Sequence, residues 1–218
     1  MKILENIKNN HLCNVTLLGN LVAKPVIRYQ ANPILAIAEF TLATHSRWLD
    51  KASQQYKEWT SYHVVKVIGD IVERSLVHAQ KGELILIQGY LLNSKNTGRE
   101  IIHATYAQTF AKGYARSINQ IHCSGQVNSP IQLVTTEQDK ELAEIKIHIN
   151  HLVYSPITQQ VNSLKIERLI HVWGKQAHYL NEHVQPGDQV VIEGKLSYFN
   201  NVDKSQFIEA QQVVLLKE

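Results

Sequence analysis

The sequence predicts an all-β protein made of two consecutive five-stranded barrels, each with one small helix. Three observations lead to this prediction. The 218 residues repeat at a spacing of about 105, each copy is divided into short β-branched stretches, and one helix-forming stretch interrupts each copy. About 100 residues per copy is a common size for a domain that buries its own core.

The repeat is carried by glycines. Residues 63–91 align without a gap with residues 168–196, and the glycines of the two segments coincide. The matched pairs are Gly69 and Gly174, Gly82 and Gly187, Gly89 and Gly194, and, at an offset of 106, Gly19 and Gly125. Because apolar residues also match between them, both halves are expected to share one fold.

In the first copy, strands are expected where apolar and β-branched residues alternate with polar ones. They are residues 14–21, 36–44, 62–68, 83–91 and 101–108. Residues 70–78, between the third and fourth strands, have a helix-forming composition, with Asp70 placed to cap the amino end.

The second copy repeats this order. Its expected strands are 119–127, 143–150, 165–173, 189–196 and 206–215, with a helix at 176–183. In its second strand Ile145, Ile147 and Ile149 alternate with polar residues and should face inward. Five strands with a helix after the third is the order of the OB-fold, a Greek-key barrel. The expected division is a domain at 1–113, a linker at 114–118 and a domain at 119–218.

Several classes of function lack their sequence signals. No apolar run approaches the ~20 residues needed to cross a bilayer, and the amino terminus lacks a secretion signal, so a cytoplasmic location is expected. Cys13 and Cys123 show neither disulfide nor zinc-site spacing. The 11 histidines are scattered, the set at 171, 178 and 183 reads as surface histidines without a carboxylate partner, and no phosphate-loop or nucleophile motif occurs. We therefore expect no metal, no cofactor and no enzymatic activity.

Charge is unevenly divided between the halves. Residues 1–116 contain 14 Lys and Arg against 8 Asp and Glu, a balance of +6, whereas residues 117–218 contain 8 against 11, a balance of −3. Such asymmetry indicates a polyanionic partner for the basic half.

Residues 45–63 interleave aromatic rings with cations in what reads as a polar loop. This combination is typical of single-stranded nucleic-acid binding, because rings stack on bases while cations contact phosphates. Trp48 and Trp59 are the expected stacking residues, with core packing as the alternative. The expected phosphate contacts are Arg28, Arg47, Lys51, Lys57 and Lys66.

The acidic second copy carries fewer candidates and is expected to bind more weakly or to contact protein. Trp173, next to Lys175, lies in an expected strand and could be either core or platform. Tyr198 and Phe199 begin an expected hairpin loop, where at least one ring should face outward.

An ordered series of motifs resembles the bacterial single-stranded DNA-binding proteins. It comprises 14–21 (NVTLLGNL), Pro25, Arg28-Tyr29, 40–44 (FTLAT), Trp48, Asp50-Lys51, Tyr62-His63, 81–82 and 87–89. The resemblance covers about residues 12–110 and, more weakly, 119–214.

This resemblance assigns roles by position. Trp48 falls where the family stacks a base, and Tyr62 falls where a second stacking ring is usual. Trp173 falls at the family's stacking position on the third strand, which Ile68 occupies in the first copy. Arg28 falls near the DNA path, and His63 falls at a subunit contact.

The resemblance also implies a homodimer with four barrels. The family's acidic tail has no counterpart in the closing residues, so recruitment of replication enzymes through such a tail is not expected. The predicted function is coating and protection of single-stranded DNA in replication, recombination or repair. An OB-fold adaptor of a primosome or conjugation complex is the alternative, and RNA recognition fits the fold equally well.

Overall fold

The computed structural model describes residues 10–50, 53–94, 97–136, 140–200 and 204–216. The chain divides into two compact units, which we call the N-terminal unit, residues 15–119, and the C-terminal unit, residues 120–218 with the start of the chain up to Asn14. Residues 10–12, which the sequence analysis placed in the first domain, lie with the second copy.

The N-terminal unit is a closed barrel. Its elements are β1 (Cys13–Leu21), β2 (Val26–Ala31), β3 (Ile34–Asp50), β4 (Gln55–Ile68), α2 (Asp70–Ser75), β5 (Glu83–Asn93) and β6 (Glu100–Lys112). Strand β1 pairs antiparallel with β5 and with β3, β3 pairs with β4, β4 runs parallel to β6, and β6 returns to β5. This circuit closes the barrel and leaves β2 as an outer strand on β3.

The C-terminal unit repeats this circuit. Its elements are β7 (Ile118–Val127), β8 (Gln132–Thr135), β9 (Glu141–Ser155), β10 (Gln160–Trp173), α3 (Lys175–His183), β11 (Gln189–Tyr198) and β12 (Gln206–Leu216). The pairings run β7–β9, β9–β10, parallel β10–β12, β12–β11 and β11–β7. The predicted tandem OB-fold is thereby confirmed.

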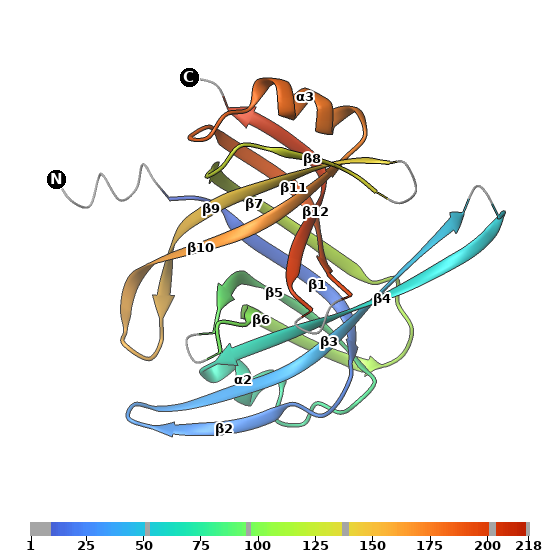
Figure 1. Ribbon diagram of the computed structural model, residues 1–218. Helices are drawn as coiled ribbons and strands as arrows, with labels where there is room; N and C mark the ends of the chain where they lie inside the picture. The colour runs from blue at the N-terminus through green and yellow to red at the C-terminus, as the bar shows by residue number, and fades with distance from the viewer. Residues whose placement is uncertain (1–9, 51–52, 95–96, 137–139, 201–203, 217–218) are drawn as a thin grey trace. The chain divides into compact units, whose positions relative to one another are not determined.

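The structure adds strand where the sequence predicted loop. Strands β2 and β8 were not predicted, because short exposed strands lack a clear alternation of apolar and polar residues. Residues 45–50 and 55–61, read as loop, continue β3 and β4 as an antiparallel ribbon that projects from its barrel (Figure 1). We call this ribbon the arm. Unbroken backbone pairing from Ile37 with Ile68 to Asp50 with Gln55 holds it in place.

The predicted cap at Asp70 is wrong. The residue that caps α2 is Gly69, with a φ of 91°, and Asp70 is the first helical residue, where its charge favours the helix dipole. Its counterpart Gly174, with a φ of 68°, precedes α3 in the same way. Because a side chain is strained in this left-handed region, glycine recurs at both positions.

Alternation of buried and exposed positions builds both cores. Ile145, Ile147 and Ile149 are buried, as predicted. Cys13 and Cys123 are both buried free thiols, and burial raises the pKa of Cys123. Neither described helix has the length and apolar character to cross a membrane.

The start of the chain completes the C-terminal unit. The backbone N–H of His11 donates to the carbonyl of Asn150 at 2.7 Å, and the N–H of Leu152 donates to the side-chain oxygen of Asn10 at 2.8 Å. The N–H of Ser124 donates to the carbonyl of Leu12 at 2.9 Å. Residues 10–12 therefore bridge β7 and β9.

Candidate nucleic-acid interface

The arm carries two exposed tryptophans on one of its faces. Cross-strand register places Trp48 opposite Lys57 and Trp59 opposite Ser46, so the two rings are diagonal neighbours on the same side of the ribbon. Trp48 is 47 % exposed and Trp59 is 53 % exposed. The alternative of core packing is therefore wrong for both, although they lie on strands and not in a loop.

The opposite face of the arm carries a cation over a tyrosine ring. The guanidinium of Arg47 lies 4.2 Å from the centroid of the Tyr56 ring and 3.5 Å from a carboxylate oxygen of Glu58. Tyr56, which is 63 % exposed, was missed among the predicted site residues, although its place in the aromatic and cationic run could have indicated it. Tyr62, which is 52 % exposed, projects from this same side, opposite Ala43 in the cross-strand register.

The outward face of β2, β3 and β4 continues from this side of the arm. Register places Lys66 opposite Glu39, and the guanidinium of Arg28 reaches Glu39 at 3.0 Å. Tyr62, Lys66 and Arg28 thus share the outer surface of one barrel wall, which we call the N-terminal sheet face.

Most of the predicted phosphate contacts are already paired with carboxylates. Arg28 pairs with Glu39, Arg47 with Glu58 and Lys57 with Asp50. Exposed pairs of this kind are worth only about 0–1 kcal/mol, so a phosphate can displace the carboxylate at small cost. Lys51 lies outside the described residues.

His63 lies in the barrel interior. Its side chain is fully buried, its Nε2 lies 2.8 Å from the hydroxyl of Thr44, and burial lowers its pKa to about 3. The predicted subunit contact stays a prediction. Through this buried hydrogen bond His63 joins β3 to β4 at the base of the arm.

In the C-terminal unit the predicted residues lie in different environments. Trp173 ends β10 and is 41 % exposed, and Lys175 is exposed at the start of α3. Tyr198 and Phe199 are both half-buried, so the expected outward ring is not found.

The hairpin between β11 and β12 folds these two rings onto their own unit. The ring centroid of Phe199 lies 4.6 Å from that of Phe207 and 5.5 Å from that of His171, and the Tyr198 hydroxyl accepts a hydrogen bond from Gln206 at 3.0 Å. His171 is itself buried beside Glu144 at 3.2 Å, and His178 pairs with Glu141, which corrects the expectation of surface histidines without carboxylate partners.

Both halves of the chain match one protein family. The model of the single-strand binding protein family matches residues 12–110 and again residues 118–216. The chain belongs to the single-strand binding protein family.

Two solved structures of a single-stranded DNA binding protein from Thermus aquaticus share the fold of this family member. A deletion mutant of that protein matches with a TM-score of 0.79 at 23 % identity, covering 96 % of each chain. The wild-type protein matches with a TM-score of 0.77 at 21 % identity, covering 96 % of this chain and 95 % of that one.

The two family repeats carry different residues at matched positions of the same face. Matching the strand registers places Val134 where the N-terminal unit has Arg28, Glu167 where it has Tyr62, and His171 where it has Lys66. Trp173 takes the place of Ile68. The C-terminal sheet face, the outward side of β8, β9 and β10, therefore lacks cations at the positions of Arg28 and Lys66, carries Lys146 and Lys165 at other positions, and gains a ring at Trp173.

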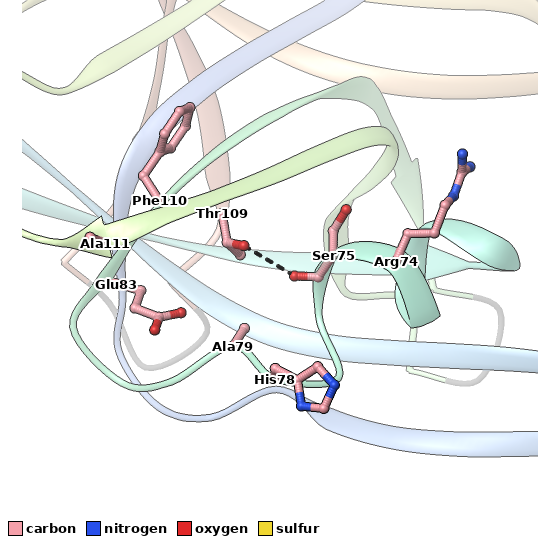
Figure 2. A pocket seen from close by; sticks show the side chains of 8 residues that line it. All are labelled: Arg74, Ser75, His78, Ala79, Glu83, Thr109, Phe110 and Ala111. Carbon is pink, nitrogen blue, oxygen red and sulfur yellow. Dashed lines mark hydrogen bonds between the residues drawn. The ribbon is translucent and has the colours of Figure 1, made fainter.

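One cleft of about 320 Å³ lies apart from these residues in the N-terminal unit. Its lining comes from the α2 region and from β6, and Figure 2 shows Thr109 of β6 beside Ser75, with the Thr109 hydroxyl donating to the Ser75 carbonyl at 3.4 Å. None of the predicted site residues lines this cleft. Within the described part of the chain, no three side chains of His, Cys, Asp or Glu gather where a metal ion could bind.

Proposed function

We propose that this single-strand binding protein coats single-stranded DNA without base-sequence preference, and that its N-terminal unit supplies the stronger site. The observation that carries this proposal is the exposed diagonal pair of Trp48 and Trp59 on the arm, with Lys57 beside Trp48 across the ribbon. Large rings on a projecting ribbon bury little in their own unit, whereas bases can stack on them at about 1–3 kcal/mol each.

The cations of the N-terminal unit line the proposed course of the single-stranded DNA. From Arg28 and Lys66 on the sheet face, the phosphates pass Tyr62 and reach Arg47 on the same side of the arm. Lys57 lies on the face of the arm that carries the tryptophans. Lys51, outside the described residues, stays a predicted phosphate contact. In the C-terminal unit, Trp173 and Lys175 form a weaker site, and Phe199 packs on His171, two residues before Trp173 on β10. Tyr198 and Phe199 stay proposed contacts of this site.

The same proposal includes a biological setting. We propose that the protein coats and protects exposed strands during replication, recombination or repair in the cytoplasm, without catalysing a reaction. The same path would accept RNA wherever the 2′-hydroxyl meets no obstacle, so RNA is the alternative polymer for this site.

Oligo-dT is expected to quench the tryptophan fluorescence of the full chain at low salt. Because the proposed site contacts phosphates, log K should fall with log salt at a slope of about −0.7 per phosphate contact. The measurement is a fluorescence titration over a salt series, with matched duplex and oligo-U alongside. Absence of quenching at low salt would favour the protein-binding adaptor, and tighter binding of oligo-U would make RNA the partner.

A homodimer is the proposed assembly. In the N-terminal unit the outward side of β1, β5 and β6 carries apolar residues that stay partly exposed in the single chain. They are Leu18, Leu84, Leu86, Tyr106 and Phe110. Such a sheet face gains stability when a second copy covers it.

Sedimentation equilibrium should give twice the mass of the 24.8 kDa chain. Leu86→Arg should lower the mass to one chain by placing a charge in the contact. Gln108 lies opposite Leu86 in the register, and Gln108→Arg tests how far the contact extends along β6. A wild-type mass of one chain would contradict the assembly and leave the binding proposal untouched.

A further inference from the structure

The segment that joins β6 to β7, residues 113–117, carries a ring that the fold does not use. We call this segment the linker. Its Tyr114 is 100 % exposed, the highest value among the large apolar and aromatic side chains of the described residues. The neighbouring residues from 111 to 116 are exposed as well. A tyrosine ring is a large surface for packing or stacking, and here none of it is buried against its own unit.

The charge around this ring is positive. Residues 101–136 contain no Asp or Glu. Arg116 is exposed, and no described residue forms an ion pair with it, whereas the described cations of the arm and of β2 pair with carboxylates. Lys112 stands opposite Glu83 in the β5–β6 register, so its charge is balanced more closely. Arg116 can therefore receive a phosphate without first losing a carboxylate partner.

Hydrogen bonds hold both ends of the linker at the base of the arm. The carbonyl of Gly113 accepts a bond from the side chain of Asn20 at 3.2 Å, and Asn20 is the register partner of Ala43 on β3. The hydroxyl of Ser117 accepts the backbone N–H of His45, two residues farther along β3, at 2.9 Å. The linker is therefore tied at both ends to one short stretch of the barrel wall.

This stretch of β3 lies beside residues of the candidate interface. Ala43 is the register partner of Tyr62, and Arg47 follows His45 by two residues on the same side of β3. No linker residue is more than two residues from an anchored end, a span of at most about 7 Å, and neighbouring strands are about 4.8 Å apart. A short oligonucleotide on this side of the arm can therefore also reach the linker.

We propose that the linker is a further contact for single-stranded DNA, in which Tyr114 stacks on a base and Arg116 binds a phosphate. This inference rests on the proposed function, because it takes the N-terminal unit to bind single-stranded DNA. The site of that unit then comprises the sheet face, the arm and the linker. The linker thus has a second role besides joining the two barrels.

Three variants of Tyr114 separate stacking from other roles of the ring. In the full chain, Tyr114→Ala should bind oligo-dT of about 16 nucleotides about ten-fold more weakly than the wild type, the effect of losing one stacked base. Tyr114→Leu should show the same loss, because leucine has no flat ring, whereas Tyr114→Phe should stay within about two-fold of the wild type. Quenching of tryptophan fluorescence measures all three, since no tryptophan is changed.

Arg116→Gln tests the phosphate contact through its salt dependence. Loss of one contact should make the slope of log K against log salt less steep by about 0.7. Arg74→Gln is the matched control, because Arg74 is exposed on α2 and lines the cleft that lies apart from the predicted site residues. Its slope should equal that of the wild type.

The tyrosine and arginine variants each can overturn the inference. A loss below about two-fold for Tyr114→Ala, an equal loss for Tyr114→Phe, or an unchanged slope for Arg116→Gln would each do so. A mass of Tyr114→Ala that differs from the wild type in sedimentation would place the ring in a contact between copies and would also overturn it. Absent quenching of the wild-type chain at low salt would contradict the proposed function itself. Far-ultraviolet circular dichroism verifies that the variants are folded.

Discussion

Alanine at both Trp48 and Trp59 is expected to weaken the binding of oligo-dT by about 100-fold or more. Each stacked base contributes about 1–3 kcal/mol, and every 1.4 kcal/mol is a factor of ten in affinity. Both rings are about half exposed, so their removal should leave the fold nearly unchanged. Anisotropy of a dye-labelled oligonucleotide measures this loss, since the variant lacks the quenched tryptophans.

Tyr154→Ala is the matched control. Tyr154 is an exposed ring on β9, in the corresponding hairpin of the C-terminal unit, where residues 147–164 contain no Lys or Arg. Its removal should change the affinity by less than about two-fold, within the range of unrelated surface substitutions. A loss below about three-fold in the tryptophan variant, or an equal loss in the control, would exclude the arm as the main stacking site.

Gly89→Ala is expected to destabilise the N-terminal unit by about 3 kcal/mol. A Cβ at Gly89 would collide with the carbonyl of His103, at the point where the β5–β6 register shifts. Overpacking costs about 1–3 kcal/mol, and backbone atoms cannot move aside as a side chain can. For a unit of this size the melting temperature should fall by about 10–20 °C, which differential scanning calorimetry would show.

Gly113→Ala serves as the comparison in the same unit. The nearest atom to a Cβ there is 3.9 Å away, an ordinary contact, and a methyl group also reduces the freedom of the unfolded chain. Its melting temperature should stay within a few degrees of the wild-type value, about 0–1 kcal/mol of change. If Gly89→Ala has the same melting temperature as Gly113→Ala, the close approach of β5 and β6 does not require glycine.

The repeated glycines explain why the tandem fold could be predicted from the sequence. Gly89 and Gly194 both stand at a register shift where two strands meet too closely for a side chain. Gly82 and Gly187 have φ values of 85° and 101°. These are demands of the backbone itself, so the same residue recurs in both copies even where the surrounding side chains differ.

The arm and the covered hairpin of the C-terminal unit could not be predicted in the same way. Residues 45–61 read as loop because no core imposes an apolar alternation on a projecting ribbon, and pairing between its two strands is invisible in either strand alone. Phe199 reads as a loop residue next to Tyr198, yet it packs on Phe207 and His171. Both outcomes depend on contacts between distant parts of the chain.

The sequence by itself determined the two OB barrels, the family and the aromatic and cationic stretch that forms the candidate site. Alternating burial along a strand, glycines at positive φ, and runs of aromatic and cationic residues each depend on residues that are close in the sequence. They can therefore be recognised from the sequence alone. The tertiary structure alone decided that Trp48 and Trp59 share one face, that Tyr62 lies on the other, and that His171 and His178 pair with Glu144 and Glu141. Strand register sets these relations, and it depends on which residues meet across strands rather than on their order in the chain.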